Sequence, residues 1–209
     1  VSEEISQPWS RSVFAENDAP GGSHYMGVGD IDGDGKIDIS AAAKGGARHP
    51  GGEWFAWWQQ GEDRYKPWTK HELSAAEPGA THLEPHDLNG DEVMDLVGTR
   101  GHGEGVLWFK GPAMDKREID PLMVKPHTLD VADIDRDGDL DFSACGREID
   151  GEVVWYENNG KGDFKKHPIL SNQSAYDLHL VDMDGDSDLD ILIAGQFSRN
   201  IIWLENLQD

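Results

Sequence analysis

Apolar and polar residues alternate in short runs along most of this chain. Before each of four Asp-rich segments, apolar residues stand four and two positions ahead of the first aspartate, as Met26 and Val28 do ahead of Asp30. A period of two places the apolar side chains on one face of a β-strand. The second segment follows the same rule with Leu83 and Pro85. The pattern therefore predicts β-strands and an all-β fold.

Four kinds of strand recur in the same order. A strand enters each Asp-rich segment, a short strand leaves it, and a glycine-rich or polar connection follows. The third strand contains tryptophan and covers residues 54–61, 106–111, 153–160 and 201–207. The fourth alternates polar and apolar residues and covers 67–73, 117–123 and 164–170. The order predicts repeating four-stranded sheets.

The repeat length indicates how the sheets are arranged. The Asp-rich segments begin at residues 30, 87, 133 and 182, at intervals of 57, 46 and 49 residues. Periods near 40–50 residues are typical of β-propellers. The expected fold is one domain over 1–209, a β-propeller of four four-stranded blades.

The last repeat lacks a fourth strand after residue 207, and a matching segment occurs near the other end. Residues 8–14 (PWSRSVF) match residues 67–73 (PWTKHEL). We therefore expect 8–14 to complete the last blade, close the ring and make 1–209 a complete unit, because closure leaves only short protected edges. The alternative is half of an eight-bladed ring, in which two chains form a homodimer by strand sharing.

The four Asp-rich segments have the spacing of calcium-binding loops. They cover residues 30–38, 87–95, 133–141 and 182–190, and each carries Asp at positions 1, 3, 5 and 9, except for Asn89. Ca²⁺ takes six to eight oxygen ligands, and a tight loop turns alternate side chains inward. A cation also offsets the repulsion among clustered carboxylates. About four Ca²⁺ sites are therefore expected.

Side chains at positions 1, 3, 5 and 9 and the backbone carbonyl at position 7 are the expected ligands. In chain order these are Asp30, Asp32, Asp34, Lys36, Asp38, Asp87, Asn89, Asp91, Val93, Asp95, Asp133, Asp135, Asp137, Asp139, Asp141, Asp182, Asp184, Asp186, Asp188 and Asp190. Zinc would need His or Cys within the loops, which contain neither. An EF-hand would need Glu at position 12 and flanking helices, and position 12 is never Glu.

The motif D-x-D-x-D-G-x-x-D between short strands, followed by a strand such as WYENNG (155–160), resembles the FG-GAP/VCBS repeat of integrin-α-like β-propellers. The resemblance covers nearly the whole chain. It implies extracellular, calcium-stabilised propellers used for adhesion, for binding carbohydrate or protein, and in some carbohydrate-active enzymes. Position 6, usually Gly in the family, is Glu92 in the second loop and Ser187 in the fourth, which implies weaker sites there.

Charge and composition restrict the partners. Eighteen Lys and Arg against 41 Asp and Glu give a formal net charge of −23, which argues against nucleic acid and anionic membranes as partners. No apolar stretch is long enough for a membrane span. The lone Cys145 excludes an internal disulfide framework.

The end of the propeller opposite the metal loops contains the scarce Arg and His residues. Starts of inner strands and connections between second and third strands should meet there. The candidate ligand-binding residues are His24, His82, His127, Tyr176, Arg48, Arg100, His102 and Arg147. Loop-built mouths on rigid scaffolds commonly bind ligands.

Three functions are consistent with these features. The favoured one is a secreted calcium-binding module, extracellular or periplasmic, that binds a glycan or an extracellular protein through the Arg/His face. The second is a carbohydrate-active enzyme of the polysaccharide lyase or sugar dehydratase type, which requires His24, His82 and His127 to converge on the axis. The third is a structural assembly subunit. No catalytic acid–base pair stands out, so no residue is assigned a catalytic role.

Overall fold

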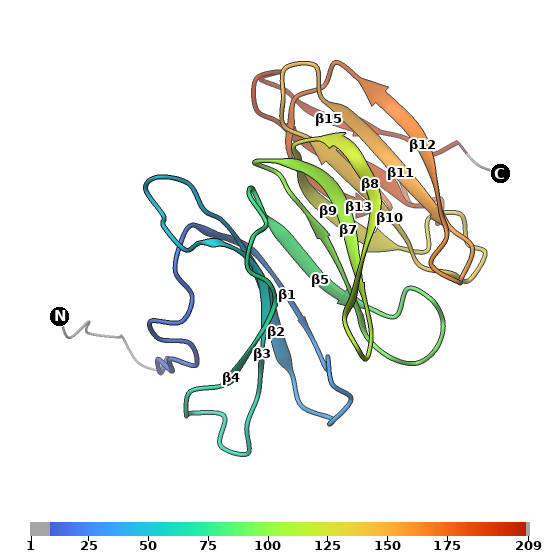
Figure 1. Ribbon diagram of the computed structural model, residues 1–209. Coiled ribbons are helices and arrows are strands. Elements are labelled where there is room, and N and C mark those ends of the chain that lie inside the picture. Colours follow the sequence, from blue (N-terminus) through green and yellow to red (C-terminus); the bar gives the residue numbers. More distant parts are fainter. Residues whose placement is uncertain (1–8, 208–209) are drawn as a thin grey trace.

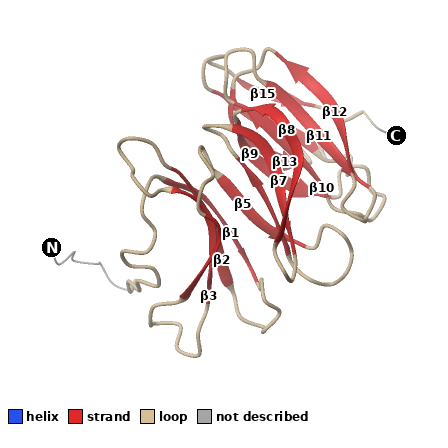
Figure 2. Ribbon diagram, viewed as in Figure 1, coloured by secondary structure: helices blue, strands red, loops and turns tan. Residues whose placement is uncertain are grey.

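The computed structural model describes residues 9–207, which form fifteen β-strands and no helix (Figure 2). The first sheet contains β1 (Ser23–Gly29), β2 (Asp38–Lys44), β3 (Glu53–Gln59) and β4 (Thr69–Ser74). The second contains β5 (His82–His86), β6 (Asp95–Thr99), β7 (Glu104–Lys110) and β8 (Asp115–Val124). The third contains β9 (Pro126–Ala132), β10 (Asp141–Gly146), β11 (Glu152–Asn158) and β12 (Phe164–Ser171). The fourth contains β13 (Ala175–Val181), β14 (Asp190–Gly195) and β15 (Ile201–Leu204).

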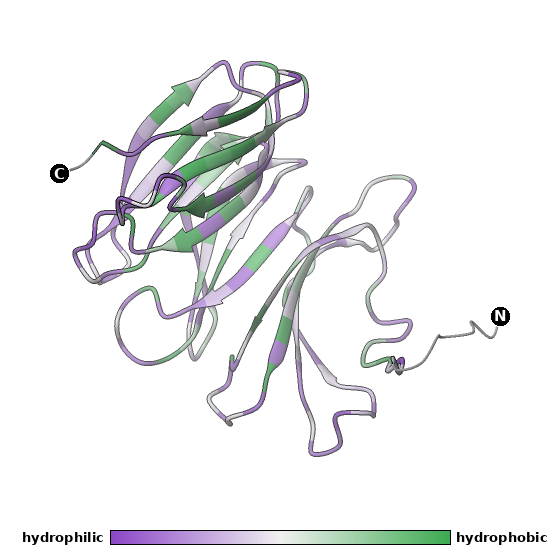
Figure 3. Ribbon diagram, turned by 180° about the vertical axis from the view of Figure 1, so that it is seen from behind, coloured by the Kyte–Doolittle hydropathy of each residue, from purple (hydrophilic) through white to green (hydrophobic). Residues whose placement is uncertain are grey.

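Strands follow chain order within every sheet, and all neighbours are antiparallel. Each Asp-rich loop joins the first two strands of its sheet. Apolar and polar segments alternate along the strands (Figure 3). The predicted all-β class and the four sheets are therefore confirmed.

The hydrophobic core lies between successive sheets. One cluster joins the first two sheets through residues such as Phe55 and Leu96. A second joins the second and third sheets through Trp108 and Phe142, and a third joins the third and fourth through Val153. Since these three clusters each lie between neighbouring sheets, the array is stabilised by nearest-neighbour contacts.

The tryptophans of the first three third strands contribute to this core. Trp57, Trp108 and Trp155 are at most 8% exposed, whereas Trp203 on β15 is 42% exposed. Trp203 differs because the fourth sheet has only three strands among the described residues. The tryptophans of the complete sheets therefore pack in the core, as their regular recurrence indicates.

The predicted closure of the ring by residues 8–14 is not confirmed. Residue 8 lies outside the described residues, and residues 9–14 form no strand. The Phe14 carbonyl accepts a hydrogen bond of 2.8 Å from the Trp68 backbone N–H, and the Phe14 ring packs on the Trp68 indole. This segment therefore covers the outer face of the first sheet, where Trp54 and Trp58 are each only 2% exposed. The first and fourth sheets lie on opposite sides of the view in Figure 1.

Candidate calcium loops and the histidine cluster

The four Asp-rich loops share one backbone conformation. The residues at positions 4 and 6 of every loop have positive φ: Gly33, Gly35, Gly90, Glu92, Arg136, Gly138, Gly185 and Ser187. Glycine adopts this left-handed region without steric cost, and other residues adopt it at a cost of about 1–2 kcal/mol. The two left-handed residues curl the chain, so that the side chains at positions 1, 3 and 5 turn inward.

Hydrogen bonds inside the loops fix the carboxylates. In the first loop, Asp30 accepts the backbone N–H groups of Asp34 at 3.0 Å and Gly35 at 2.8 Å. In the second, Asp87 accepts those of Asp91 and Glu92. The carboxylate at position 1 therefore holds the backbone of the loop in place, as the side chain of an Asx turn does.

Carboxylate oxygens converge in three of the four loops. They lie within 4.8 Å of one another in the groups Asp30, Asp32, Asp38; Asp133, Asp135, Asp137; and Asp182, Asp184, Asp186. The second loop differs. Asn89 replaces an aspartate there, and the Lys110 ammonium lies 3.4 Å from Asn89 Oδ1 and 3.6 Å from Asp91 Oδ2. A lysine cation therefore already offsets part of the negative charge of the second loop, as Lys36 does in the first loop at 2.8 Å from Asp34 Oδ2; the second loop alone has an amide in place of one carboxylate.

The aspartate at position 9 connects each loop to the tryptophan strand of its sheet. Asp38, Asp95, Asp141 and Asp190 are at most 1% exposed. In the third sheet, Asp141 accepts the Ile134 N–H at 3.3 Å with one oxygen and the Asn158 N–H at 2.8 Å with the other. The other three make equivalent pairs of bonds. We call this arrangement the position-9 clamp.

The loops fit a hard divalent cation. Among the described residues, Asp133 Oδ1 and Asp188 Oδ1 are buried without a hydrogen-bond partner, and such oxygens need a partner. Burial also raises the pKa of Asp38 and Asp95, and raises that of Asp141 to about 6. A bound cation would stabilise the ionised carboxylates, and oxygen-only donor sets suit Ca²⁺. The role of position 7 as a carbonyl ligand stays a prediction.

A second constellation lies at the opposite ends of the inner strands. His24 and His127 are the second residues of β1 and β9, and His102 lies in the connection between β6 and β7. One ligand nitrogen from each of these histidines lies within 4.8 Å of the others. We call these three residues the histidine cluster. A seven-residue strand such as β1 places it about 20 Å from the Asp-rich loops.

Two cations border the histidine cluster. Arg147 Nη1 lies 2.6 Å from His102 Nδ1. Burial, and then the charges of Lys44 and Arg147, lower the pKa of His24. Burial, Arg147 and Lys44 in that order lower the pKa of His102 to about 3, and burial is the main cause that lowers the pKa of His127 to about 4. The three imidazoles are therefore neutral at physiological pH.

Backbone hydrogen bonds between successive sheets hold this end together. The Gly79 N–H donates to the Lys44 carbonyl at 3.1 Å, and the His102 N–H donates to the Gly79 carbonyl at 3.1 Å. Gly101 allows the close approach, because a β-carbon there would lie 2.6 Å from His127 Cα. The connections that carry Lys44 and His102 are thus tied to the scaffold.

The candidate ligand-binding residues divide into two groups. His24, His102, His127, Tyr176 and Arg147 come together, and the Tyr176 ring lies 3.9 Å from that of His127. His82, Arg100 and Arg48 lie outside this group. His82 Nε2 lies 2.8 Å from Glu84, and its Nδ1 accepts the Leu129 N–H. Hence only two of the three histidines required by the enzyme hypothesis converge.

Arg100 has a structural role, and Arg48 is exposed on the surface. The Arg100 guanidinium pairs with both Glu77 and Glu118 at 2.7 Å. These contacts join the β4–β5 connection, which carries Glu77, to β8, which carries Glu118. Surface ion pairs contribute little to stability, but Glu77 is buried and its pair with Arg100 is part of a network with Lys116.

A small cavity lies among the four inner strands. It has a volume of about 220 Å³, and its walls include Tyr25, His82, Glu84, Asp130 and Asp177. Tyr25 separates it from the histidine cluster, since the Tyr25 ring contacts both His82 and His127. The cavity is acidic, so an anionic ligand would favour the histidine end over the cavity.

Sequence reasoning missed two features. One is the position-9 clamp. The other is the pair of histidines opposite two of the third-strand tryptophans: Trp57 stacks on His71 at 4.2 Å, and Trp155 stacks on His167 at 4.5 Å. The recurring Lys-His and Lys-Lys-His runs in the fourth strands were the available signal.

A family model and a solved structure are similar to this chain. The family model described as FG-GAP-like repeat matches residues 30–98 and 133–193, which include all four Asp-rich loops and more than half of the chain. Among solved structures, the V. cholerae biofilm matrix protein Bap1 is similar over 95% of this chain and 33% of its own, at 18% identity and a TM-score of 0.45. The chain thus spans about a third of that structure's length. No curated protein matches the chain. The chain belongs to the FG-GAP-like repeat family.

Proposed function

We propose that this chain is a calcium-stabilised extracellular module that binds an acidic carbohydrate at the end bearing the histidine cluster. The observation that carries the proposal is the separation of charge along the inner strands. The Asp-rich loops occupy one end, and Lys44, Arg147 and three neutral imidazoles occupy the other. In a chain of net charge −23, this is a local cationic surface.

The groups at this end suit a carboxylate-bearing sugar. Within the described residues, neither Lys44 nor Arg147 forms an ion pair with a carboxylate, and the buried Arg147 Nε has no hydrogen-bond partner. Arginine binds carboxylates in a bidentate geometry. Tyr176 is 37% exposed and offers a ring beside these donors. Aromatic and cationic groups together match the apolar face and the charge of an acidic sugar.

An extracellular location is part of the proposal. Loops of this type suit surroundings with millimolar calcium, and the FG-GAP-like repeats support this reading. In the described part of the chain, no helix has the length and apolar character to cross a membrane.

Binding to a glycan array in calcium buffer tests the proposal. We expect the wild type to retain acidic glycans over neutral ones, and Arg147→Gln to weaken retention at least tenfold. Arg64→Gln is the matched control, because Arg64 lies in the β3–β4 connection beyond the calcium end of β3. Absence of glycan binding, together with capture of a protein partner, would overturn the carbohydrate assignment. Equal loss in both variants would show a nonspecific charge effect.

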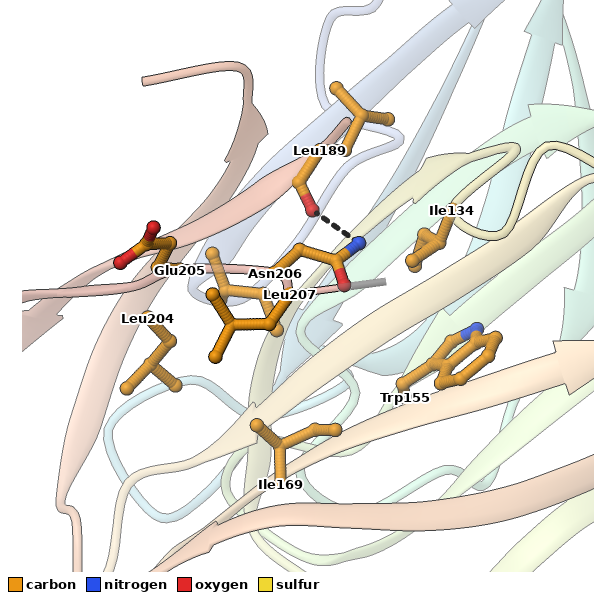
Figure 4. Close-up of a pocket in the computed structure, with 9 residues that line it drawn as sticks. Ile134, Trp155, Ile169, Leu189, Leu204, Glu205, Asn206 and Leu207 are labelled. Atoms are coloured by element: carbon orange, nitrogen blue, oxygen red, sulfur yellow. Dashed lines mark hydrogen bonds between the residues drawn. The ribbon is translucent and has the colours of Figure 1, made fainter. Parts of the chain in front are cut away.

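A second candidate, an assembly subunit, rests on the open edge of the fourth sheet. Ile201 on β15 is 79% exposed and Trp203 is 42% exposed. An apolar pocket of about 200 Å³ lies nearby, lined by Trp155, Leu204 and Leu207 among others (Figure 4). Edge strands of this kind accept a further strand. The occupant proposed here is residues 8–14 of a second copy, whose sequence matches that of residues 67–73 and which would have to leave the outer face of its own first sheet.

Light scattering after size-exclusion chromatography tests this candidate. We expect a dimer in wild type and a monomer for Ile201→Lys, because a charge on β15 blocks strand addition. A monomeric wild type at all concentrations would exclude sharing of this strand between chains.

A further inference from the structure

We propose that His24, His102 and His127 form a binding site for a zinc-type divalent transition-metal ion, separate from the calcium loops. The three residues come from β1, the β6–β7 connection and β9, so three segments distant in sequence converge on one point. Their ligand nitrogens lie within 4.8 Å of one another. A tetrahedral ion with Zn–N bonds near 2.0–2.1 Å needs nitrogens about 3.4 Å apart, which small side-chain movements would provide.

His127 has the hydrogen bonding of a metal ligand. It is fully buried, and its Nδ1 lies 2.7 Å from the Tyr176 carbonyl oxygen. Since a carbonyl only accepts, Nδ1 carries the proton and Nε2 carries the lone pair. That Nε2 is buried and has no hydrogen-bond partner among the described residues. A metal-binding histidine typically donates its other N–H to a carbonyl in this way.

The donor set selects the type of metal. Three neutral imidazoles suit zinc and related ions, whereas Ca²⁺ prefers oxygen. The histidine cluster is thus expected to prefer Zn²⁺ to Ca²⁺, and the Asp-rich loops are expected to prefer Ca²⁺ to Zn²⁺. With three protein ligands, the fourth position of a tetrahedral ion would remain open for water or an anion.

The Arg147 side chain would compete with a metal ion at the histidine cluster. Its guanidinium donates to His102 Nδ1 at 2.6 Å and would have to leave that nitrogen if the metal binds there. Its charge and that of Lys44 also repel a cation. Removal of the Arg147 charge should therefore tighten metal binding, whereas it should weaken binding of an acidic glycan. This opposite response separates the present proposal from the proposed function, on which it does not depend.

Cobalt(II) titration of untagged, calcium-saturated protein tests the site. Tetrahedral Co²⁺ with nitrogen ligands absorbs visible light much more strongly than octahedral Co²⁺ with oxygen ligands, so ions in the Asp-rich loops do not interfere. We expect one equivalent to give the intense spectrum, and one equivalent of Zn²⁺ to abolish it. His24→Ala and His102→Ala should each weaken binding at least tenfold, and Arg147→Met should tighten it severalfold.

His179→Ala is the matched control, since the His179 side chain is 66% exposed and lies outside the histidine cluster. It should bind Co²⁺ as the wild type does. Calcium-dependent melting of each variant verifies that it folds. The proposal is overturned if neither the wild type nor Arg147→Met gives the intense spectrum, or if the spectrum persists in His24→Ala and His102→Ala.

Discussion

At the scale of single residues, the Asp-rich loops combine side chains that attract a cation with a backbone that is costly to form. A residue other than glycine can occupy the left-handed positions 4 and 6 only if other contacts of the loop offset the backbone strain. Arg136, Glu92 and Ser187 adopt this conformation without being glycine. Positions 4 and 6, which are not among the expected ligands, therefore tolerate residues other than glycine.

Replacement of Ser187 by glycine should stabilise the protein. Ser187 has a φ of 79°, in the region where glycine has the advantage. We expect a gain of about 0.5–1 kcal/mol in the free energy of unfolding, measured by urea denaturation with calcium present. The reciprocal change Gly35→Ser, at φ 84° with open space around the glycine, should destabilise by a similar amount. Equal stability of all three proteins would contradict the strain argument.

Glu84 should make stability depend on pH. Burial disfavours its ionised form, but hydrogen bonds from His82 and His86 outweigh burial and lower the pKa of Glu84 to about 2. A lowered pKa contributes stability above the unfolded-state value near 4.3–4.5, and that contribution is lost as the pH falls toward 2. Glu84→Gln should therefore cost about 1–3 kcal/mol at pH 7.

The difference in unfolding free energy between wild type and Glu84→Gln should shrink below pH 4. Comparing the two proteins at each pH cancels the shared effect of acid on the calcium loops. A difference that is constant from pH 7 to pH 3 would contradict the assignment.

At the scale of elements, each sheet is tied together at the end of its second strand. The position-9 clamp bonds one carboxylate to the loop before it and to the end of the tryptophan strand, as Asp141 does through Ile134 and Asn158. The clamp uses both oxygens for backbone N–H groups, so it acts with or without metal.

Asp141→Asn should destabilise the protein even in EDTA. The asparagine amide would place an N–H donor against a backbone N–H donor, which leaves one buried group without a partner at a cost of about 1–3 kcal/mol. Urea denaturation in EDTA separates this effect from calcium binding. Asp150→Asn, at an exposed position, serves as the control and should be neutral. An Asp141→Asn variant that loses stability only with calcium present would show that the residue acts solely as a ligand.

The elements also show what the sequence predicted and what it did not. The loops and strands were predictable because their signals are local: aspartate spacing and alternation. The convergence of His102 with His24 and His127 depends on how three sheets pack. His82 has the same place at the start of its inner strand, yet Glu84, two residues later on the same strand, binds its Nε2. The cover provided by Phe14 is equally nonlocal, since it depends on packing against the outer face of the first sheet, as on the Trp68 indole.

At the scale of the whole molecule, the two ends of the inner strands carry different ligand groups. The Asp-rich loops supply carboxylates at one end, and the histidine cluster supplies imidazoles at the other. The inner strands run from the histidine cluster to the Asp-rich loops, so one element sets the distance between them. The stacked sheets keep both ends in place through nearest-neighbour packing. Ions bound in the Asp-rich loops would therefore stabilise the scaffold that positions the groups at the other end.

The second loop should bind calcium more weakly than the others. Its position 3 is Asn89, which supplies a neutral oxygen where the other loops have a carboxylate, and Lys110 lies against Asn89 and Asp91 and competes with the ion. Isothermal titration of chelator-treated protein should resolve three tighter sites and one weaker site, and Lys110→Met should tighten the weak one. Four equal sites in the wild type would contradict this role of Lys110.

Differential scanning calorimetry of the calcium-loaded and the fully chelated protein tests the calcium-stabilised fold most directly. Each ion at a hundredfold excess over its Kd should add about 2.7 kcal/mol to the free energy of unfolding. At about 2–4 °C per kcal/mol for a chain of this size, chelation should lower Tm by at least about 10 °C. Readdition of calcium should restore the original melt. An identical Tm with and without calcium would contradict the account, because the Asp-rich loops would then not bind the ion that stabilises the array.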